Sequence, residues 1–164
     1  TIAKKGYETV QEEALAIAPI GQEIKLKAME CIDRDTDAFY TMMDAMRLPK
    51  KTETEISYRN EQIELSTRGA ILSPLETLRL SHEALLLSAR IAKIGNSNAL
   101  SDAGVAALTA LCAAKAANYN ILINIAGITN ASFKQQTLSE AAVLIDKCEA
   151  IAEQVECAIL AKLS

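Results

Sequence analysis

The sequence predicts an all-α fold, a helical bundle of about five helices. Apolar residues recur at the three- and four-residue spacing of a helix face through most of the 164 residues, and no convincing stretch alternates as a strand does. Three prolines and six glycines are too few for an all-β protein with many turns. Half of the residues are hydrophobic, which predicts one packed domain over residues 1–164.

The first predicted helix covers about residues 4–45, where apolar positions lie one or two turns apart. Pro19 and Gly21 predict a break or a kink near its start, because proline cannot donate the helical hydrogen bond. Residues 48–51 form a loop, since proline disfavours helical backbone in the residue before it.

A capping box marks the next helix start. Thr52 and Glu55 have the spacing in which each side chain bonds the other's backbone N–H, and the helix is predicted to run to about Leu72. The pair at 73–74, Ser-Pro, repeats a start signal. It leaves two interpretations open: a third helix over 75–94, or a kink inside one long helix.

Two more helices complete the bundle. Ser101 is predicted to cap a helix that ends near Ile125, and Asn130 to cap a last helix that ends near Leu163. Eight alanines between positions 103 and 117 form a small-residue face in the first of these. Because small side chains let another backbone approach closely, this face predicts self-association.

Composition excludes several functional classes. Lysine and arginine total 17 against 21 aspartates and glutamates, and no basic stripe with interleaved aromatics occurs, so no nucleic-acid partner is predicted. No run reaches about 18 apolar residues, so no membrane span is predicted. The four cysteines match no zinc-ligand spacing and lie in apolar helical patterns. They are therefore predicted to be small apolar residues packed in helices, with no metal site, in a cytoplasmic protein.

Three carboxylates end the apolar part of the first helix. Asp33 and Asp37 share one face, whereas Asp35 points toward the side of Phe39. A carboxylate beside apolar and aromatic neighbours suits general acid or base catalysis. The alternative is a solvated acidic face paired with nearby arginines.

Two other polar groups are candidate binding residues. Asn96, Ser101 and Asp102 surround a helix N-terminus, whose free N–H groups can hold a polar or anionic ligand group. Asn120 and Asn124 lie one turn apart on an otherwise apolar helix. A buried amide needs a hydrogen-bond partner, which can be a ligand or a neighbouring helix. Ordinary capping and interhelix bonding are the structural alternatives for the two groups.

Five segments occur in a characteristic order and spacing: DRDTDAF at 33–39, AMRLPK at 45–50, GNSN at 95–98, SDAGVAA at 101–107 and NILIN at 120–124. Together they resemble the cyclodeaminase/cyclohydrolase family, the cyclodeaminase part of formimidoyltransferase-cyclodeaminase and its stand-alone bacterial relatives. The resemblance covers nearly the whole chain from Lys4.

The resemblance implies an all-helical, dimeric enzyme that acts on one-carbon adducts of tetrahydrofolate. Such enzymes close 5-formimidoyltetrahydrofolate to 5,10-methenyltetrahydrofolate with loss of ammonia, or hydrolyse the methenyl form. The folate is the substrate, and no bound cofactor is implied. Asp35 matches the family's catalytic aspartate. The implied substrate-binding residues are Asn96, Ser101, Asp102, Asn120, Asn124 and, for a polycarboxylate tail, Lys50.

Two alternatives to cyclodeamination stay open at this point. One is methenyltetrahydrofolate cyclohydrolase activity in the same pocket, and the other is a non-catalytic helical interaction module. One departure from the family also matters. Relatives carry a helix opened by a Pro-Gly-Gly-Gly-Ser segment before the stretch that resembles Lys-Lys-Gly-Tyr at 4–7. The sequence therefore predicts a domain that lacks its N-terminal helix and, with it, part of the site and of the dimer core.

Overall fold

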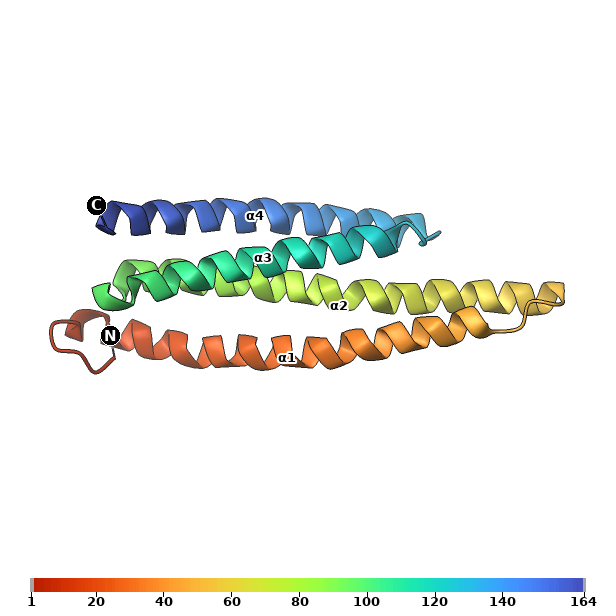
Figure 1. Cartoon of the computed structure of the whole chain (residues 1–164), viewed down its shortest axis with the longest axis horizontal. Helices are drawn as coiled ribbons and strands as arrows, with labels where there is room; N and C mark the ends of the chain where they lie inside the picture. Colours follow the sequence, from red (N-terminus) through yellow and green to blue (C-terminus); the bar gives the residue numbers. More distant parts are fainter. Residues whose placement is uncertain (1, 164) are drawn as a thin grey trace.

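The computed structural model of the chain describes residues 2–163 and consists of long helices that run up and down beside one another (Figure 1). They are α1 (Gln11–Arg47), α2 (Glu53–Ile94), α3 (Leu100–Ile125) and α4 (Ala131–Leu163), with short 3-10 turns η1 (Glu8–Val10) and η2 (Ser97–Ala99) before α1 and α3. No strand occurs in this described part, and the all-α prediction is confirmed.

Two predicted helix starts are confirmed by their cap geometry. The hydroxyl of Thr52 accepts from the N–H of Glu55 at 3.2 Å, and the Glu55 carboxylate accepts from the N–H of Thr52 at 3.0 Å. At the start of α4, the side-chain oxygen of Asn130 accepts from the N–H of Phe133 at 2.9 Å. Both caps use side chains within four residues of the helix start, so local sequence was sufficient to predict them.

The predicted start of α3 is wrong by one or two residues. The helix begins at Leu100 after Ala99, which makes no side-chain cap bond, and Ser101 lies inside the first turn. A polar cap does exist just upstream. Asn96 caps η2 and its side chain accepts from the N–H of Asn98 at 3.1 Å. The side-chain cap that the sequence predicted at Ser101 is therefore made by Asn96, at the start of the 3-10 turn before α3.

Neither internal proline ends its helix. Pro19 lies inside α1, and Pro74 lies inside α2, which continues for 42 residues. The bundle consequently has four long helices rather than about five, because the Ser-Pro pair marks a position in one long helix. The first helix also starts at Gln11, later than the predicted position near residue 4.

The main core lies among α2, α3 and α4. Its fully buried large side chains are Ile71, Leu78 and Leu85 from α2, Ile121 from α3 and Cys148 from α4. Burial in this apolar core raises the pKa of the Cys148 thiol to about 11. Transfer of such side chains out of water supplies most of the favourable free energy of folding.

Helix α1 packs almost entirely on α2. A small separate cluster of Ile24, Cys31 and Leu80 joins the two helices. An ion pair between Arg90 and Glu13 at 3.1 Å supports the contact near one end. At the other end, the hairpin of α1 and α2 extends beyond α3 and α4 (Figure 1). The part of α2 near the α1–α2 loop therefore has α1 beside it but not α3 or α4 (Figure 1).

The small-residue face of α3 is used inside the chain. The buried alanines that form it pack in the main core: Ala103, Ala107, Ala110, Ala114 and Ala117. Within one chain α2 and α4 cover these alanines, and the self-association predicted from this face stays a prediction. One helical segment, Ser97–Ile125, is long and apolar enough by length and composition alone to cross a membrane. Its alanine side is the part that packs in this core.

The cysteine prediction is confirmed for two residues and wrong for two. Cys31 and Cys148 are buried, whereas Cys112 on α3 and Cys157 on α4 are exposed. All four are free thiols.

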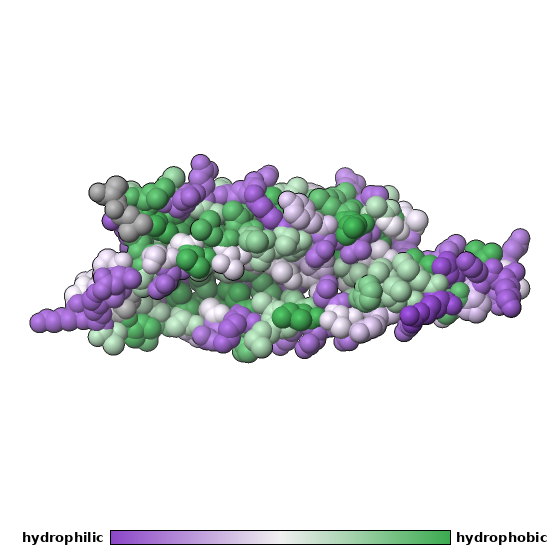
Figure 2. Space-filling model, viewed as in Figure 1, coloured by the Kyte–Doolittle hydropathy of each residue, from purple (hydrophilic) through white to green (hydrophobic). Residues whose placement is uncertain are grey.

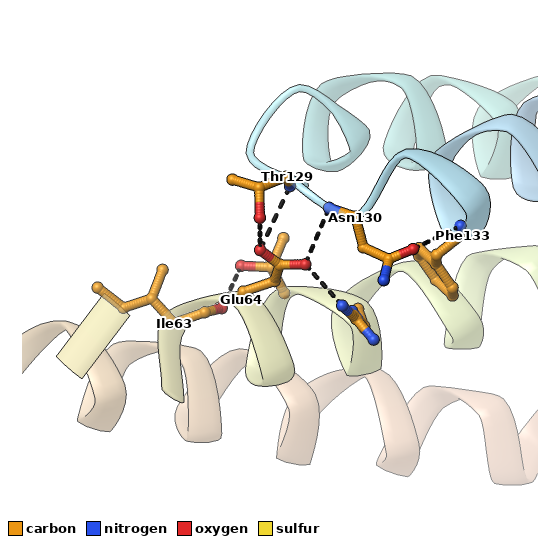
Figure 3. A network of polar contacts seen from close by, with 7 residues as sticks. Ile63, Glu64, Thr129, Asn130 and Phe133 are labelled. Atoms are coloured by element: carbon orange, nitrogen blue, oxygen red, sulfur yellow. Dashed lines mark hydrogen bonds and ion pairs between the residues drawn. The ribbon is translucent and has the colours of Figure 1, made fainter. Parts of the chain in front are cut away.

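A carboxylate on α2 fastens the turn between α3 and α4 (Figure 3). The carboxylate of Glu64 accepts from the hydroxyl and N–H of Thr129, from the N–H of Asn130 and from the guanidinium of Arg68. The guanidinium first, and then the Thr129 hydroxyl, lower the pKa of the Glu64 carboxyl from 4.5 to about 2. These hydrogen bonds hold the start of α4 against α2.

We expect Glu64→Gln to melt at a lower temperature than the wild type at pH 7. A lowered pKa in the folded state stabilises the fold at pH values above the unfolded value of 4.5, and the gain disappears as the pH falls toward about 2. The melting difference should therefore shrink between those two values. Circular dichroism melts over pH 2–7 measure it, with the exposed Glu61→Gln three residues earlier as the control. A difference that stays constant with pH contradicts the assignment.

Candidate functional site

An open groove of about 420 Å³ lies between α1 and α3, over the middle of α2. Figure 2 shows a hollowed seam with apolar side chains along it, while the protruding tip of the hairpin is mostly hydrophilic. The groove exists because α1 packs on one side of α2 and α3 packs on another. The lining residues are Ala28, Cys31, Ile32, Asp35 and Thr36 from α1, Ser73, Pro74 and Thr77 from α2, and Ala113, Ala116, Ala117 and Asn120 from α3.

Two of the predicted site residues line this groove. Asp35 and Asn120 line it from opposite walls, although they are far apart in the sequence. Asp33 and Asp37 do not line it. Among the three clustered carboxylates, the structure thus singles out the one that the resemblance implies.

The apolar shelter expected for Asp35 is incomplete within one chain. Asp35 itself is exposed. Ile32 and Phe39, which share its side of α1, are 66% and 52% exposed. A bound ligand or a partner surface is needed to exclude water from this carboxylate.

A hydroxyl that the sequence analysis did not select supports the position of Asp35. Ser73 is buried, and its hydroxyl donates to the backbone carbonyl of Cys31 at 3.2 Å across the α1–α2 contact. In an α-helix, that same carbonyl accepts the N–H of Asp35. The other buried hydroxyls of α2 donate to carbonyls of their own helix: Ser66, Thr67, Ser81 and Ser88. Ser73 is therefore a cross-helix anchor for the turn that carries Asp35.

The polar group around Asn96 is not part of this groove in one chain. Ser101 and Asn120 are separated by 19 residues of one helix, which corresponds to about 28 Å. Asn96 instead accepts from the ammonium of Lys4 at 2.8 Å, at the end of the bundle where the chain begins (Figure 1). Asp102 is exposed in the first turn of α3, near this same end.

Lys50 is also distant from the groove. It lies exposed in the loop between α1 and α2, at the tip of the hairpin. Fifteen residues separate it from Asp35, twelve of them in α1, which places the loop beyond about 18 Å along the helix. Within one chain, Lys50 does not join the residues that line the groove.

Asn124 has a structural partner. Pro74 lacks an N–H, so the carbonyl of Ala70 has no helical donor within α2. The side-chain amide of Asn124 donates to that carbonyl at 3.4 Å. The amide on α3 thereby replaces the N–H that the proline in α2 lacks.

We expect Asn124→Leu to destabilise the fold by about 1 kcal/mol, because it leaves a carbonyl without its donor. The cost should be smaller in a Pro74→Ala background, since the restored N–H then bonds Ala70. Urea unfolding of the four members of this double-mutant cycle measures both values. Equal costs in the two backgrounds would show that Asn124 does not act through the proline.

The described residues contain no group of three or more histidine, cysteine, aspartate or glutamate side chains that could hold a metal ion. The fold and the groove together define a helical domain that presents one carboxylate and one amide on facing walls that are otherwise largely apolar. These groups can orient a polar ligand and transfer a proton to or from it.

The chain belongs to the formiminotransferase-cyclodeaminase family, which it matches over residues 1–143. It is 30% identical to a methenyltetrahydrofolate cyclohydrolase from Methylorubrum extorquens, over 94% of this chain and 74% of that protein. It is 32% identical to a formimidoyltransferase-cyclodeaminase from Gallus gallus, over 89% of this chain and only 27% of that longer protein.

A solved structure shares the fold. A formiminotetrahydrofolate cyclodeaminase from Thermotoga maritima superimposes with a TM-score of 0.86 over 99% of this chain and 77% of that one, at 24% identity. The family resemblance and the all-α architecture predicted from the sequence are thereby confirmed.

Proposed function

We propose that this protein converts 5-formimidoyltetrahydrofolate to 5,10-methenyltetrahydrofolate and ammonia, with Asp35 as the general acid and base. One observation carries the proposal: in a chain of this family, the aspartate implied to be catalytic lines the same groove as an implied binding residue, Asn120. The cyclodeaminase names of its relatives support the reaction class.

The reaction needs only proton transfers at an electrophilic carbon. Nitrogen N10 of the folate attacks the formimidoyl carbon and closes a five-membered ring. The former imine nitrogen then leaves as ammonia, carrying its own hydrogen, the hydrogen from N10 and one proton taken up from solution. A single carboxyl group can protonate the leaving nitrogen and accept the N10 proton, which is general acid–base catalysis.

The groove offers a place for the pteridine ring. Ala113, Ala116 and Ala117 form an apolar wall that a flat ring can contact, and Asn120 at the end of this wall has both a donor and an acceptor. The ring would cover Asp35 and remove water from it, which strengthens its electrostatic effect on the reacting nitrogens.

Methenyltetrahydrofolate cyclohydrolase activity is the second candidate. The Methylorubrum extorquens relative, which aligns with 94% of this chain, carries that name. In this reaction water adds to the methenyl carbon, the ring opens to a formyltetrahydrofolate and one proton is released. The same carboxylate would accept that proton.

Product assays with both substrates separate the two reactions. The protein is incubated with 5-formimidoyltetrahydrofolate and, in parallel, with 5,10-methenyltetrahydrofolate. Ammonia release and methenyl formation from the first support cyclodeamination. Methenyl loss faster than the spontaneous rate, without activity on the first, supports the hydrolase. Absence of both activities and of folate binding supports a non-catalytic helical module.

We propose a cytoplasmic homodimer with the folate as its small-molecule ligand. In such a dimer the Lys50 ammonium of either subunit would be available to the glutamate tail of the folate. Lys50→Glu should then raise KM for a polyglutamylated substrate more than for a monoglutamate.

A further inference from the structure

Both walls of the groove are hydrogen-bonded to its floor at one place in α2. The hydroxyl of Ser73 donates to the carbonyl of Cys31 on α1 at 3.2 Å, and the carbonyl of Ala70 accepts from the side chain of Asn124 on α3 at 3.4 Å. Ala70 and Ser73 are three residues apart, which is less than one helical turn. The two walls are therefore bonded to α2 within about 5 Å along its axis.

Each of these hydrogen bonds lies one turn from a candidate site residue. Asp35 follows Cys31 by four residues on α1, and Asn120 precedes Asn124 by four residues on α3. Four residues span about 6 Å of helix and return to the same face. Each hydrogen bond therefore fixes the turn that carries one of the two site residues.

The separation of the two walls is set through α2. Helices α1 and α3 each pack extensively on α2 and have almost no direct contact with each other. A shift of either wall on α2 therefore changes the distance between Asp35 and Asn120. A displacement of about 1 Å at a reacting group can lower a rate by about 100-fold.

The Ser-Pro pair at 73–74 provides for both hydrogen bonds. Ser73 is buried and uses its hydroxyl across the helix contact, whereas the buried Ser81 and Ser88 of the same helix donate to carbonyls of α2 itself. Pro74 has no N–H, which leaves the carbonyl of Ala70 available to a donor from α3. The pair thus accounts for a donor toward one wall and an acceptor toward the other.

We propose that Ser73 and Pro74 are positioning residues, which set the separation of Asp35 and Asn120 before a ligand binds. Ser73 positions the turn of α1, and Pro74 positions the turn of α3 through the carbonyl that it leaves available. The positioning of the two helices follows from the contacts alone. Its effect on turnover also rests on the proposed function.

Kinetics of Ser73→Ala test the α1 side, with whichever of the two folate substrates the protein converts. Its kcat should fall by about tenfold with KM within about twofold of the wild type, because the displaced Asp35 acts in the chemical step. Ser73→Thr keeps the hydroxyl and should restore most of the kcat.

Ser81→Ala is the matched control for this test. It removes a hydroxyl that is as buried as that of Ser73, at 6% against 7% exposed, but that bonds within α2. It should lower the melting temperature as Ser73→Ala does and keep kcat within about twofold of the wild type. Equal kcat losses in the two alanine variants, or wild-type kcat in Ser73→Ala, would overturn the positioning role of Ser73.

The α3 side is tested by separating stability from binding. Asn124→Leu should raise KM several-fold, because the turn that carries Asn120 loses its bond to α2. Adding Pro74→Ala restores an N–H for the carbonyl of Ala70 and should recover stability, but KM should stay high because α3 is still not bonded to α2 at this point. A wild-type KM in Asn124→Leu, or a KM that recovers together with stability, would overturn the role of Pro74.

Hydrogen exchange tests Ser73 without any substrate. Amide protons of residues 28–38 on α1 should exchange about fivefold faster in Ser73→Ala than in the wild type, because this turn has lost a hydrogen bond to α2. The same segment should exchange at the wild-type rate in Ser81→Ala. Unchanged exchange in Ser73→Ala would overturn the positioning of α1.

The two kinds of measurement separate the two proposals. If the wild type converts neither folate, the proposed function fails, and the exchange rates still decide whether Ser73 fixes α1. If Asp35→Asn is inactive while Ser73→Ala keeps its full kcat, the proposed function stands and the positioning role is wrong.

Discussion

Asp35→Asn should lower turnover by about 100-fold or more in the intact protein, because the amide cannot donate or accept the proton that the reaction moves. Melting temperature and helical content should stay near the wild-type values, since Asp35 is exposed on α1. Steady-state kinetics with a reduced folate substrate, together with thermal melts, measure both effects.

The neighbouring carboxylates are matched controls for this prediction. Asp33 and Asp37 lie on the same helix within two residues of Asp35, but neither lines the groove. Their asparagine variants should retain turnover within a few-fold of the wild type. Equal losses for all three variants would indicate a general effect of acidic charge, and wild-type turnover of Asp35→Asn would remove its catalytic role.

Leu78→Ala should lower the free energy of unfolding by about 2–5 kcal/mol, the largest stability effect expected here. Leu78 is fully buried in the core among α2, α3 and α4, so truncation leaves a cavity lined by three helices. Leu86→Ala is the control on the same helix, at a position that is 44% exposed.

Urea unfolding monitored by circular dichroism measures both leucine variants. The control should change the free energy of unfolding by much less, because its side chain already contacts water in the folded state. Similar losses at positions 78 and 86 would place the core elsewhere on α2.

Local signals were sufficient to predict the helix starts at Thr52 and Asn130, because each cap is made by residues within one turn. The Ser-Pro pair at 73–74 was ambiguous for a physical reason. Pro74 removes the helical donor to the carbonyl of Ala70, and the side chain that supplies one, Asn124, lies 54 residues further along the chain. Nothing in the local sequence specifies such a partner.

Of the predicted site residues, Asp35 and Asn120 line one groove, and their roles stay predictions. The residue patterns pointed to a cluster of three aspartates and to Asn120 and Asn124, and the family resemblance selected Asp35 as catalytic. Asp35 and Asn120 line the same groove because α1 and α3 pack on different sides of α2. Hydrophobic periodicity alone does not determine that packing. The alanine pattern of α3 likewise predicted a face on which another helix can pack closely. It did not determine whether that helix belongs to this chain or to another copy.

We propose that the groove between α1 and α3 binds the folate. Calorimetric titration with tetrahydrofolate tests it most directly, using the wild type and Thr36→Trp, in which an indole would fill the groove from α1. Ala142→Trp, at an exposed position on α4, is the control. We predict saturable binding by the wild type and the control and at least tenfold weaker binding by Thr36→Trp. Equal affinity for all three proteins would contradict the claim.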